Sequence, residues 1–245
     1  MTHMVWQPRI YRQDMDAAGL VGFEIVHGET DLHISACREL RSEAAALAAA
    51  LRADLEGYIS THPVFFESYV PVEVEPDAPE IVRAMAEAAR HAGVGPMAAV
   101  AGAVAERVAR GLAAHSTEVI VENGGDLFIM GTAPRKVLVL AGDSPLSGKV
   151  AISLPARVPP IAVCTSSGKV GHSVSLGTAH AVTIVARGGA LADAVATAAG
   201  NLVHGPEDIE SALGKAMSVA GVRGAVIVAG DALGALGRIE LIPIA

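Results

Sequence analysis

Aromatic side chains and cysteines are scarce in this sequence of 245 residues. Of the four Phe, three Tyr and one Trp, only Phe128 comes after Tyr69. Few rings are therefore available to stack on nucleic-acid bases. The two cysteines, Cys37 and Cys164, provide neither a disulfide framework nor a Cys-x-x-Cys metal site.

Positive charge and long apolar runs are also lacking. The chain has 18 Lys and Arg against 26 Asp and Glu, a net charge of -8, so it has no basic stripe to neutralise a phosphate backbone. Its longest apolar stretch, residues 96–105, is about half the length of a membrane span. The first residues contain no export signal. We therefore expect a cytoplasmic protein with neither a nucleic-acid nor a membrane partner.

The apolar residues that are present are small and aliphatic. Hydrophobic residues make up 51% of the chain, and 26 residues are glycine. This composition and length predict a packed core in one domain, residues 1–245. Apolar periodicity predicts helices at 39–60, 79–92, 96–113, 190–203 and 206–219. It predicts strands at 20–36 (a pair), within 62–80, at 117–130 (a pair), 136–141, 149–154, 161–164, 180–186 and 225–229, the last of the series.

The helix predicted at 190–203 carries one polar stripe. Asp193, Thr197 and Asn201 follow one another at steps of four, which places them on one helical face. A carboxylate and a hydroxyl are hard oxygen ligands, and Mg²⁺ commonly takes one or two such ligands from a protein. The alternative is structural: Asp193 complements a helix N-terminus and Thr197 bonds a backbone carbonyl.

The segment Asn123-Gly124-Gly125-Asp126 follows a predicted buried strand. Two glycines let the backbone approach a ligand closely, and the flanking side chains can bond to it. The same four residues also suit a tight hairpin turn with no ligand.

A Ser-rich loop is predicted at 165–171, directly after Cys164. Its hydroxyls and free backbone N–H groups can cradle an anion, although the glycine spacing excludes a Walker A loop. Ser166 begins a short S-x-x-K pattern and His172 follows closely, so these two residues are the catalytic candidates. Cys164 ends an apolar strand and is more typical of packing than of a nucleophile. The expected ligand-contacting residues of the loop are Thr165, Ser166, Ser167 and Gly168.

Six segments, taken together and in this order, resemble the ApbE-like family of FAD:protein FMN transferases. The segments are ETDL (29–32), VGPMAAVAG (94–102), VENGGD (121–126), AGDSPLS (141–147), CTSSGKVGHS (164–173) and LADAVATAAGN (191–201). The resemblance implies an α+β fold of two tandem duplicated T-fold-like halves, about 1–130 and 131–245, with antiparallel sheets and packed helices. A faint echo between 119–127 and 226–233 agrees with a duplication.

The resemblance also implies a ligand and a metal. Asp193 and Thr197 take the family's Mg²⁺-binding positions, and the segments 123–126 and 165–168 line a cleft for FAD or another flavin nucleotide. The expected reaction is a Mg²⁺-dependent transfer from this phosphorylated small molecule. For a ring against the flavin, only Phe128, or Phe65, Phe66 and Tyr69 from the N-terminal third, are candidates.

The chain resembles a smaller cytoplasmic branch of the family more closely than the transferases. It has Ala101 before Gly102, where the transferases carry a Lys. That branch is associated with sulfur assimilation, in homocysteine formation, beside redox partners. The alternative is therefore an accessory factor that keeps the cleft without flavin transfer, works with a redox or sulfur-transfer protein, and could use Cys164.

Overall fold

The computed structural model describes residue 12 and residues 17–168 and 177–244. Within them, the strands form an eight-stranded antiparallel sheet in the order β1-β2-β3-β4-β7-β8-β9-β10, and a three-stranded sheet in the order β11-β6-β5. The large sheet contains β1 (Val21–His27), β2 (Thr30–Ala36), β3 (Val119–Asn123), β4 (Asp126–Met130), β7 (Ile161–Ser166), β8 (Ala181–Ala186), β9 (Val222–Ala229) and β10 (Ala232–Gly237). The small sheet contains β5 (Arg135–Leu138), β6 (Val150–Leu154) and β11 (Glu240–Pro243).

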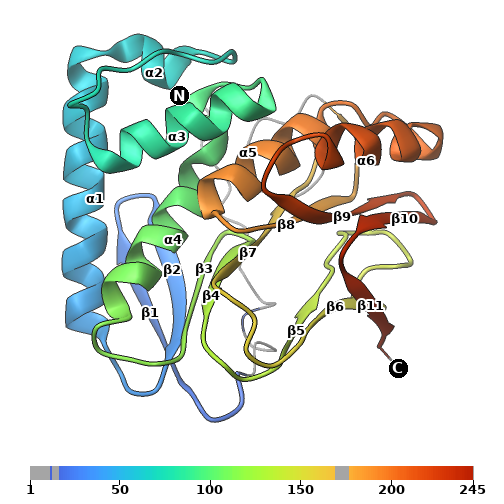
Figure 1. Cartoon of the computed structure of the whole chain (residues 1–245), viewed down its shortest axis with the longest axis horizontal. Coiled ribbons are helices and arrows are strands. Elements are labelled where there is room, and N and C mark those ends of the chain that lie inside the picture. Colours follow the sequence, from blue (N-terminus) through green and yellow to red (C-terminus); the bar gives the residue numbers. More distant parts are fainter. Residues whose placement is uncertain (1–11, 13–16, 169–176, 245) are drawn as a thin grey trace.

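The helices gather on one side of the large sheet, and the small sheet lies on the other (Figure 1). Helix α4 packs on β3 and β4, α5 on β7 and β8, and α6 on β9 and β10. The described helices are α1 (Arg41–Thr61), α2 (Pro63–Glu67), α3 (Glu80–Ala92), α4 (Val100–Leu112), α5 (Gly189–Gly200) and α6 (Ile209–Met217), with 3-10 helices η2 (Pro96–Ala99) and η3 (Pro206–Asp208). None of them is long and apolar enough to cross a membrane. The antiparallel sheets with helices packed on one side confirm the predicted α+β class.

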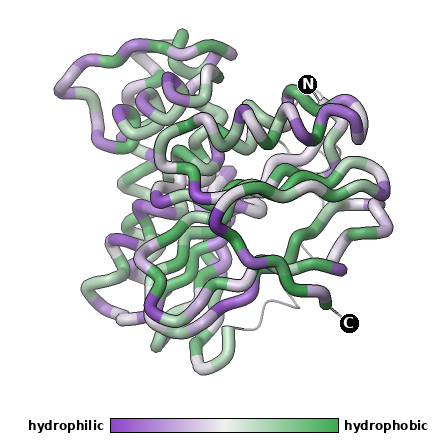
Figure 2. Tube along the Cα trace, turned by 45° about the vertical axis from the view of Figure 1, so that its right-hand side comes forward, coloured by the Kyte–Doolittle hydropathy of each residue, from purple (hydrophilic) through white to green (hydrophobic). Residues whose placement is uncertain are grey.

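The inner strands of the large sheet, such as β3 and β8, are buried on both faces and read as continuous apolar runs, whereas the edge strands β1 and β10 are largely exposed. Successive side chains of a strand point to opposite faces. On β7, Ala162 and Cys164 belong to the core beneath the helices, whereas Ile161 and Val163 belong to the core beneath the small sheet. In Figure 2 the interior strands are mainly hydrophobic, and hydrophilic residues are more frequent in the outer loops.

The order of elements repeats along the chain. Two strands, a helical segment and two strands (β1 to β4) are followed by the same arrangement from β7 to β10. The two groups of strands join through a short ladder between β4 and β7, in which Phe128 pairs with Ala162. This repetition is the pattern expected of tandem halves. The boundary near residue 130 and the duplication itself stay predictions.

The sequence-based prediction of elements is wrong in three places. No strand occurs within 62–80; Pro63, whose fixed φ suits the first helical position, instead begins α2. The Ser-rich loop starts later than expected, because β7 continues through Ser166, which pairs with Val182 of β8. The series of strands does not end at 229, since β10 and β11 follow. The glycine-rich sequence of β10 conceals its strand character.

Helices α4 and α5 cross with their backbones in contact. A Cβ atom built on Gly102 would lie 2.3 Å from the carbonyl oxygen of Gly189, and one built on Gly189 would lie 2.1 Å from that of Gly102. Neither position can therefore carry a side chain without moving the helices apart. Because α4 lies on β3 and β4 while α5 lies on β7 and β8, this crossing fixes the spacing of the two halves of the sheet.

The crossing generates a test of stability. We expect Gly102→Ala to lower the free energy of unfolding by about 3 kcal/mol, because the added methyl group overlaps the Gly189 backbone. The matched control is Gly214→Ala on α6, where a Cβ meets nothing within 4 Å; it should raise stability by about 0.5–1 kcal/mol. Urea unfolding measures both. Equal effects of the two substitutions would contradict the close crossing.

Candidate functional site

Two carboxylates bridge the crossing of α4 and α5. The Gly102 N–H donates to Asp193 Oδ2 at 2.9 Å, and the Gly189 N–H donates to Glu106 Oε2 at 2.6 Å. Both glycines lie in the first turn of their helices, where backbone N–H groups lack intrahelical partners. Each carboxylate therefore caps the N-terminus of the other helix, and the positive end of that helix favours its charge.

The β3–β4 hairpin reaches the same point. Gly124 and Gly125 have φ angles of 66° and 103° and form a tight turn, as the structural interpretation of this segment predicted. The turn pairs Asn123 with Asp126. The Asn123 side-chain amide donates to the carbonyl oxygen of Ala101 at 3.1 Å. The hairpin and Asp193 thus meet on adjacent residues at the start of α4.

Asp126 and Asp193 influence each other electrostatically. Burial raises the pKa of the Asp126 carboxyl well above its usual range, and the negative charge of Asp193 raises it further. Burial also raises the pKa of Asp193 to about 7, against the opposing effect of the Gly102 and Ala101 N–H groups. Two carboxylates that resist ionisation together form a site in which a cation is stabilising.

Cys164 lies beside this pair, in surroundings that disfavour its reactive thiolate form. The thiol is fully buried and donates to the carbonyl oxygen of Gly189 at 3.7 Å. Burial, followed by the charges of Asp126 and Asp193, raises its pKa well above the usual range. Nucleophilic sulfur chemistry needs the thiolate, so this environment gives no support to a sulfur-transfer role for Cys164.

The predicted Ser-rich segment divides between two faces of the sheet. The Thr165 hydroxyl pairs with that of Thr183 at 2.9 Å, and the alternation of β7 places it opposite Cys164. The Thr165 N–H, by contrast, donates to Asp126 Oδ1 at 3.2 Å. Ser166 shares the helix-side face with Cys164, and its buried hydroxyl has no hydrogen-bond partner among the residues that the structure describes.

The end of the segment packs through its backbone. The Gly168 N–H donates to the Ala179 carbonyl oxygen at 3.0 Å, and a Cβ on Gly168 would lie 2.1 Å from the Gly177 carbonyl oxygen. Ser167, which lies between Ser166 and Gly168 in the chain, is partly buried. The second catalytic candidate, His172, lies outside the described residues.

Thr197 lies one turn beyond Asp193 on α5. It is buried. The structure shows Asp193 capping a helix N-terminus, that of α4 rather than of its own helix. The expected bond from the Thr197 hydroxyl to a backbone carbonyl stays a prediction. Among the described residues, no group of three or more His, Cys, Asp or Glu could hold a metal ion.

A second polar cluster lies on the opposite face of the large sheet. Glu122 is almost fully buried, and its Oε1 accepts the Gly125 N–H at 2.8 Å. Its other oxygen accepts from Arg12, which also donates to Asp31 Oδ1 at 2.7 Å. Through the bond from Gly125 to Glu122, this cluster holds the hairpin turn from the face of the sheet opposite the helices. No sequence pattern predicts this cluster, because residues 12, 31 and 122 are far apart in the chain.

The reciprocal capping by Glu106 was not predicted from the sequence. One signal indicates it: Gly102 and Glu106 on one helix have the same four-residue spacing as Gly189 and Asp193 on the other.

The aromatic rings do not form a stacking platform in the described structure. Phe128 is fully buried, and the Arg110 guanidinium carbon lies 5.2 Å from its ring centre. Phe65 is buried in the core near α2, while Phe66 and Tyr69 are exposed. A ligand here would be recognised through polar groups and backbone.

The raised pKa of Asp193 predicts a pH dependence of stability. The folded state holds this proton up to about pH 7, whereas the unfolded chain releases it near pH 4, so the residue lowers stability as pH rises between these values. Asp193→Asn should therefore gain free energy of unfolding relative to the wild type from pH 5 to pH 8. Urea unfolding at both pH values measures this. An unchanged pH dependence in Asp193→Asn would refute the shift, and Asp54→Asn, at an exposed position of α1, serves as control.

Comparison with solved structures shows the fold. The chain matches a mutant flavin transferase ApbE from Vibrio cholerae with a TM-score of 0.60 and 12% identity, over 90% of this chain and 97% of that one. It matches the apo flavinyl transferase ApbE of Pseudomonas stutzeri with a TM-score of 0.57 and 15% identity, over 91% and 96%. At these identities the likeness concerns the fold alone.

Sequence comparison shows the family. A UPF0280 protein of Methanopyrus kandleri is 42% identical over 229 residues, 89% of this chain and 91% of the relative. One of Methanocaldococcus jannaschii is 45% identical over 193 residues, 77% and 78%. The family model described as "AbpE bacteria" matches residues 12–235. The chain therefore belongs to the ApbE-like family, together with its UPF0280 relatives from archaea.

Proposed function

We propose that this protein is a cytoplasmic Mg²⁺-dependent transferase that acts on FAD or a closely related phosphorylated flavin nucleotide. Asp193 and Thr197 would hold the metal ion. Asn123 and Asp126, with the backbone of Gly124 and Gly125, would contact the ligand beside it. The segment 165–168 would complete the cleft, with the Ser166 hydroxyl directed to the reacting end of the ligand.

The proposal rests on the convergence of polar side chains at the start of α4. Side chains from two distant segments, Asn123 and Asp193, bond to neighbouring residues at the start of α4, at 3.1 and 2.9 Å. Asp126 is close enough to Asp193 for the charge of one to shift the pKa of the other. A purely structural hairpin needs no such partner. Convergent polar groups with shifted pKa values, held on rigid elements, are typical of a functional site.

The donor set fits Mg²⁺. The Asp193 carboxylate and the Thr197 hydroxyl are hard oxygen donors, one turn apart on α5, and Thr197 is buried. Mg²⁺ typically completes its shell with water and substrate phosphate, so two protein ligands are sufficient. When bound, the ion would neutralise charge on the pyrophosphate of the nucleotide.

The surrounding residues would orient the ligand and manage protons. The Ser166 hydroxyl, which has no hydrogen-bond partner within the described chain, can donate a hydrogen bond to a group entering the site or accept one from it. Burial and the negative charge of Asp193 raise the pKa of Asp126 and so favour its protonated form, which makes this carboxyl a candidate proton donor. The Ala101-Gly102 pair presents backbone in place of the transferases' Lys, so the charge at this point must come from the metal ion.

The proposal is tested by flavin transfer. The purified protein, FAD, Mg²⁺ and a peptide with a flavinylation motif should yield covalently bound FMN, detected by fluorescence and intact mass. EDTA should abolish the product. Asp193→Asn and Thr197→Val should each lower the rate at least about tenfold, because each removes a metal ligand.

Two controls make this result interpretable. Asp54→Asn removes an exposed carboxylate on α1 and should leave the rate unchanged. Calorimetry with Mg²⁺ and FAD reports binding separately from transfer. Tight binding without covalent product at high enzyme concentration would contradict the transferase and leave a binding role. The absence of both would reject the whole proposal.

A further inference from the structure

A cavity of ≈ 430 Å³ lies on the side of the large sheet that faces away from the helices. Its walls come from the small sheet, from β7, β8 and β9, and from the connection between β10 and β11. Small-ligand sites typically measure about 300–1,000 Å³ and are mainly apolar. The lining is of this kind, with Ile152, Leu154, Val158, Ile161, Val185 and Ile239.

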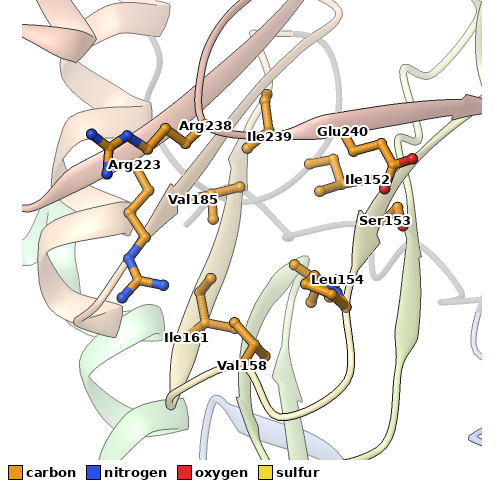
Figure 3. Close-up of a pocket in the computed structure, with 11 residues that line it drawn as sticks. Ile152, Ser153, Leu154, Val158, Ile161, Val185, Arg223, Arg238, Ile239 and Glu240 are labelled. Carbon is orange, nitrogen blue, oxygen red and sulfur yellow. The ribbon is translucent and has the colours of Figure 1, made fainter.

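Two arginines lie at one end of this cavity. The Arg238 N–H donates to the Arg223 carbonyl oxygen at 2.7 Å, directly beyond the last pair of the β9–β10 ladder, Gly237 with Gly224. The backbone therefore holds the two residues side by side. Figure 3 shows both guanidinium groups at the same end, with Glu240 at the other. Arg223 is half-buried and Arg238 is exposed, so an anion can reach both guanidinium groups from solvent.

This charge arrangement suits an anionic ligand. The chain as a whole is acidic, with a net charge of -8, yet this end of the cavity carries two positive charges, and the lining carboxylate of Glu240 lies at the other end. Guanidinium groups bind carboxylate and phosphate oxygens through paired hydrogen bonds. A basic end joined to an apolar wall matches a molecule with one anionic end and one apolar end.

We propose that this cavity binds a small anionic amphiphile, with its carboxylate or phosphate at Arg223 and Arg238 and its hydrocarbon body against Ile152, Leu154 and Val185. The site is separate from the proposed flavin site, because the large sheet lies between them. Its occupancy would stabilise the seam between the two sheets, since the ligand contacts β6, β8 and β9 at once.

Calorimetry with octanoate as the probe tests the charge requirement. Octanoate should bind, whereas 1-octanol and octyltrimethylammonium, which lack the anionic end, should bind at least about tenfold more weakly. Arg223→Gln and Arg238→Gln should each weaken octanoate binding by about tenfold or more. Arg90→Gln, at an exposed position of α3, removes the same charge elsewhere and should have no effect. No binding of octanoate, or equal binding by octanol, would overturn the proposal.

A second variant tests the location without altering charge. Val158 lines the cavity from a segment outside the strands, so Val158→Trp should fill the space while the sheets remain intact. Its thermal unfolding should stay close to that of the wild type, and octanoate binding should be lost. Wild-type affinity in a folded Val158→Trp variant would place the ligand elsewhere and refute the assignment.

Discussion

The contact between the backbones of α4 and α5 is the constraint on which the rest of the structure depends. Gly102 and Gly189 let the helices approach until each carbonyl lies where the other's side chain would be. Only at this separation can Asp193 reach the Gly102 N–H and Glu106 reach the Gly189 N–H. Small residues at this crossing thus permit the close approach of the two helices, which aromatic side chains would prevent.

The crossing also determines the chemistry of the candidate site. It brings Asp193 close to Asp126, and burial makes the joint ionisation of the two carboxyls unfavourable. The hairpin that carries Asp126 is held on the other face of the sheet by Glu122 and Arg12. The site is thus rigid on both sides and short of positive charge, which favours a bound cation.

The sequence predicted much of the architecture because periodicity and turn residues act locally. The helix at 190–203 and the hairpin at 123–126 were found in this way, as was the polar stripe of Asp193 and Thr197. The convergence of the hairpin with α5 depends on tertiary packing, which spacing along the chain does not encode. Thr165 shows the same limit: its residue type suits a ligand site, but the alternation of β7 directs its hydroxyl away.

The family resemblance supplied what local patterns could not. No local pattern distinguishes a capping carboxylate from a metal ligand, and Asp193 has the geometry of the first while the resemblance implies the second. The two roles are compatible, because a carboxylate has two oxygens and about four lone-pair sites. Neither local periodicity nor the family resemblance predicted strand β10, because its glycines weaken the apolar pattern and it lies outside the six resembling segments.

A crystal structure of the protein with Mn²⁺ and FAD tests the central claim most directly. Mn²⁺ shares the oxygen ligands of Mg²⁺ and can be located by anomalous scattering. The account predicts an anomalous peak bonded to Asp193 and to the Thr197 hydroxyl, with the Gly102 N–H still donating to the Asp193 carboxylate. A well-ordered crossing with no metal at Asp193, or a metal bound elsewhere, would contradict it.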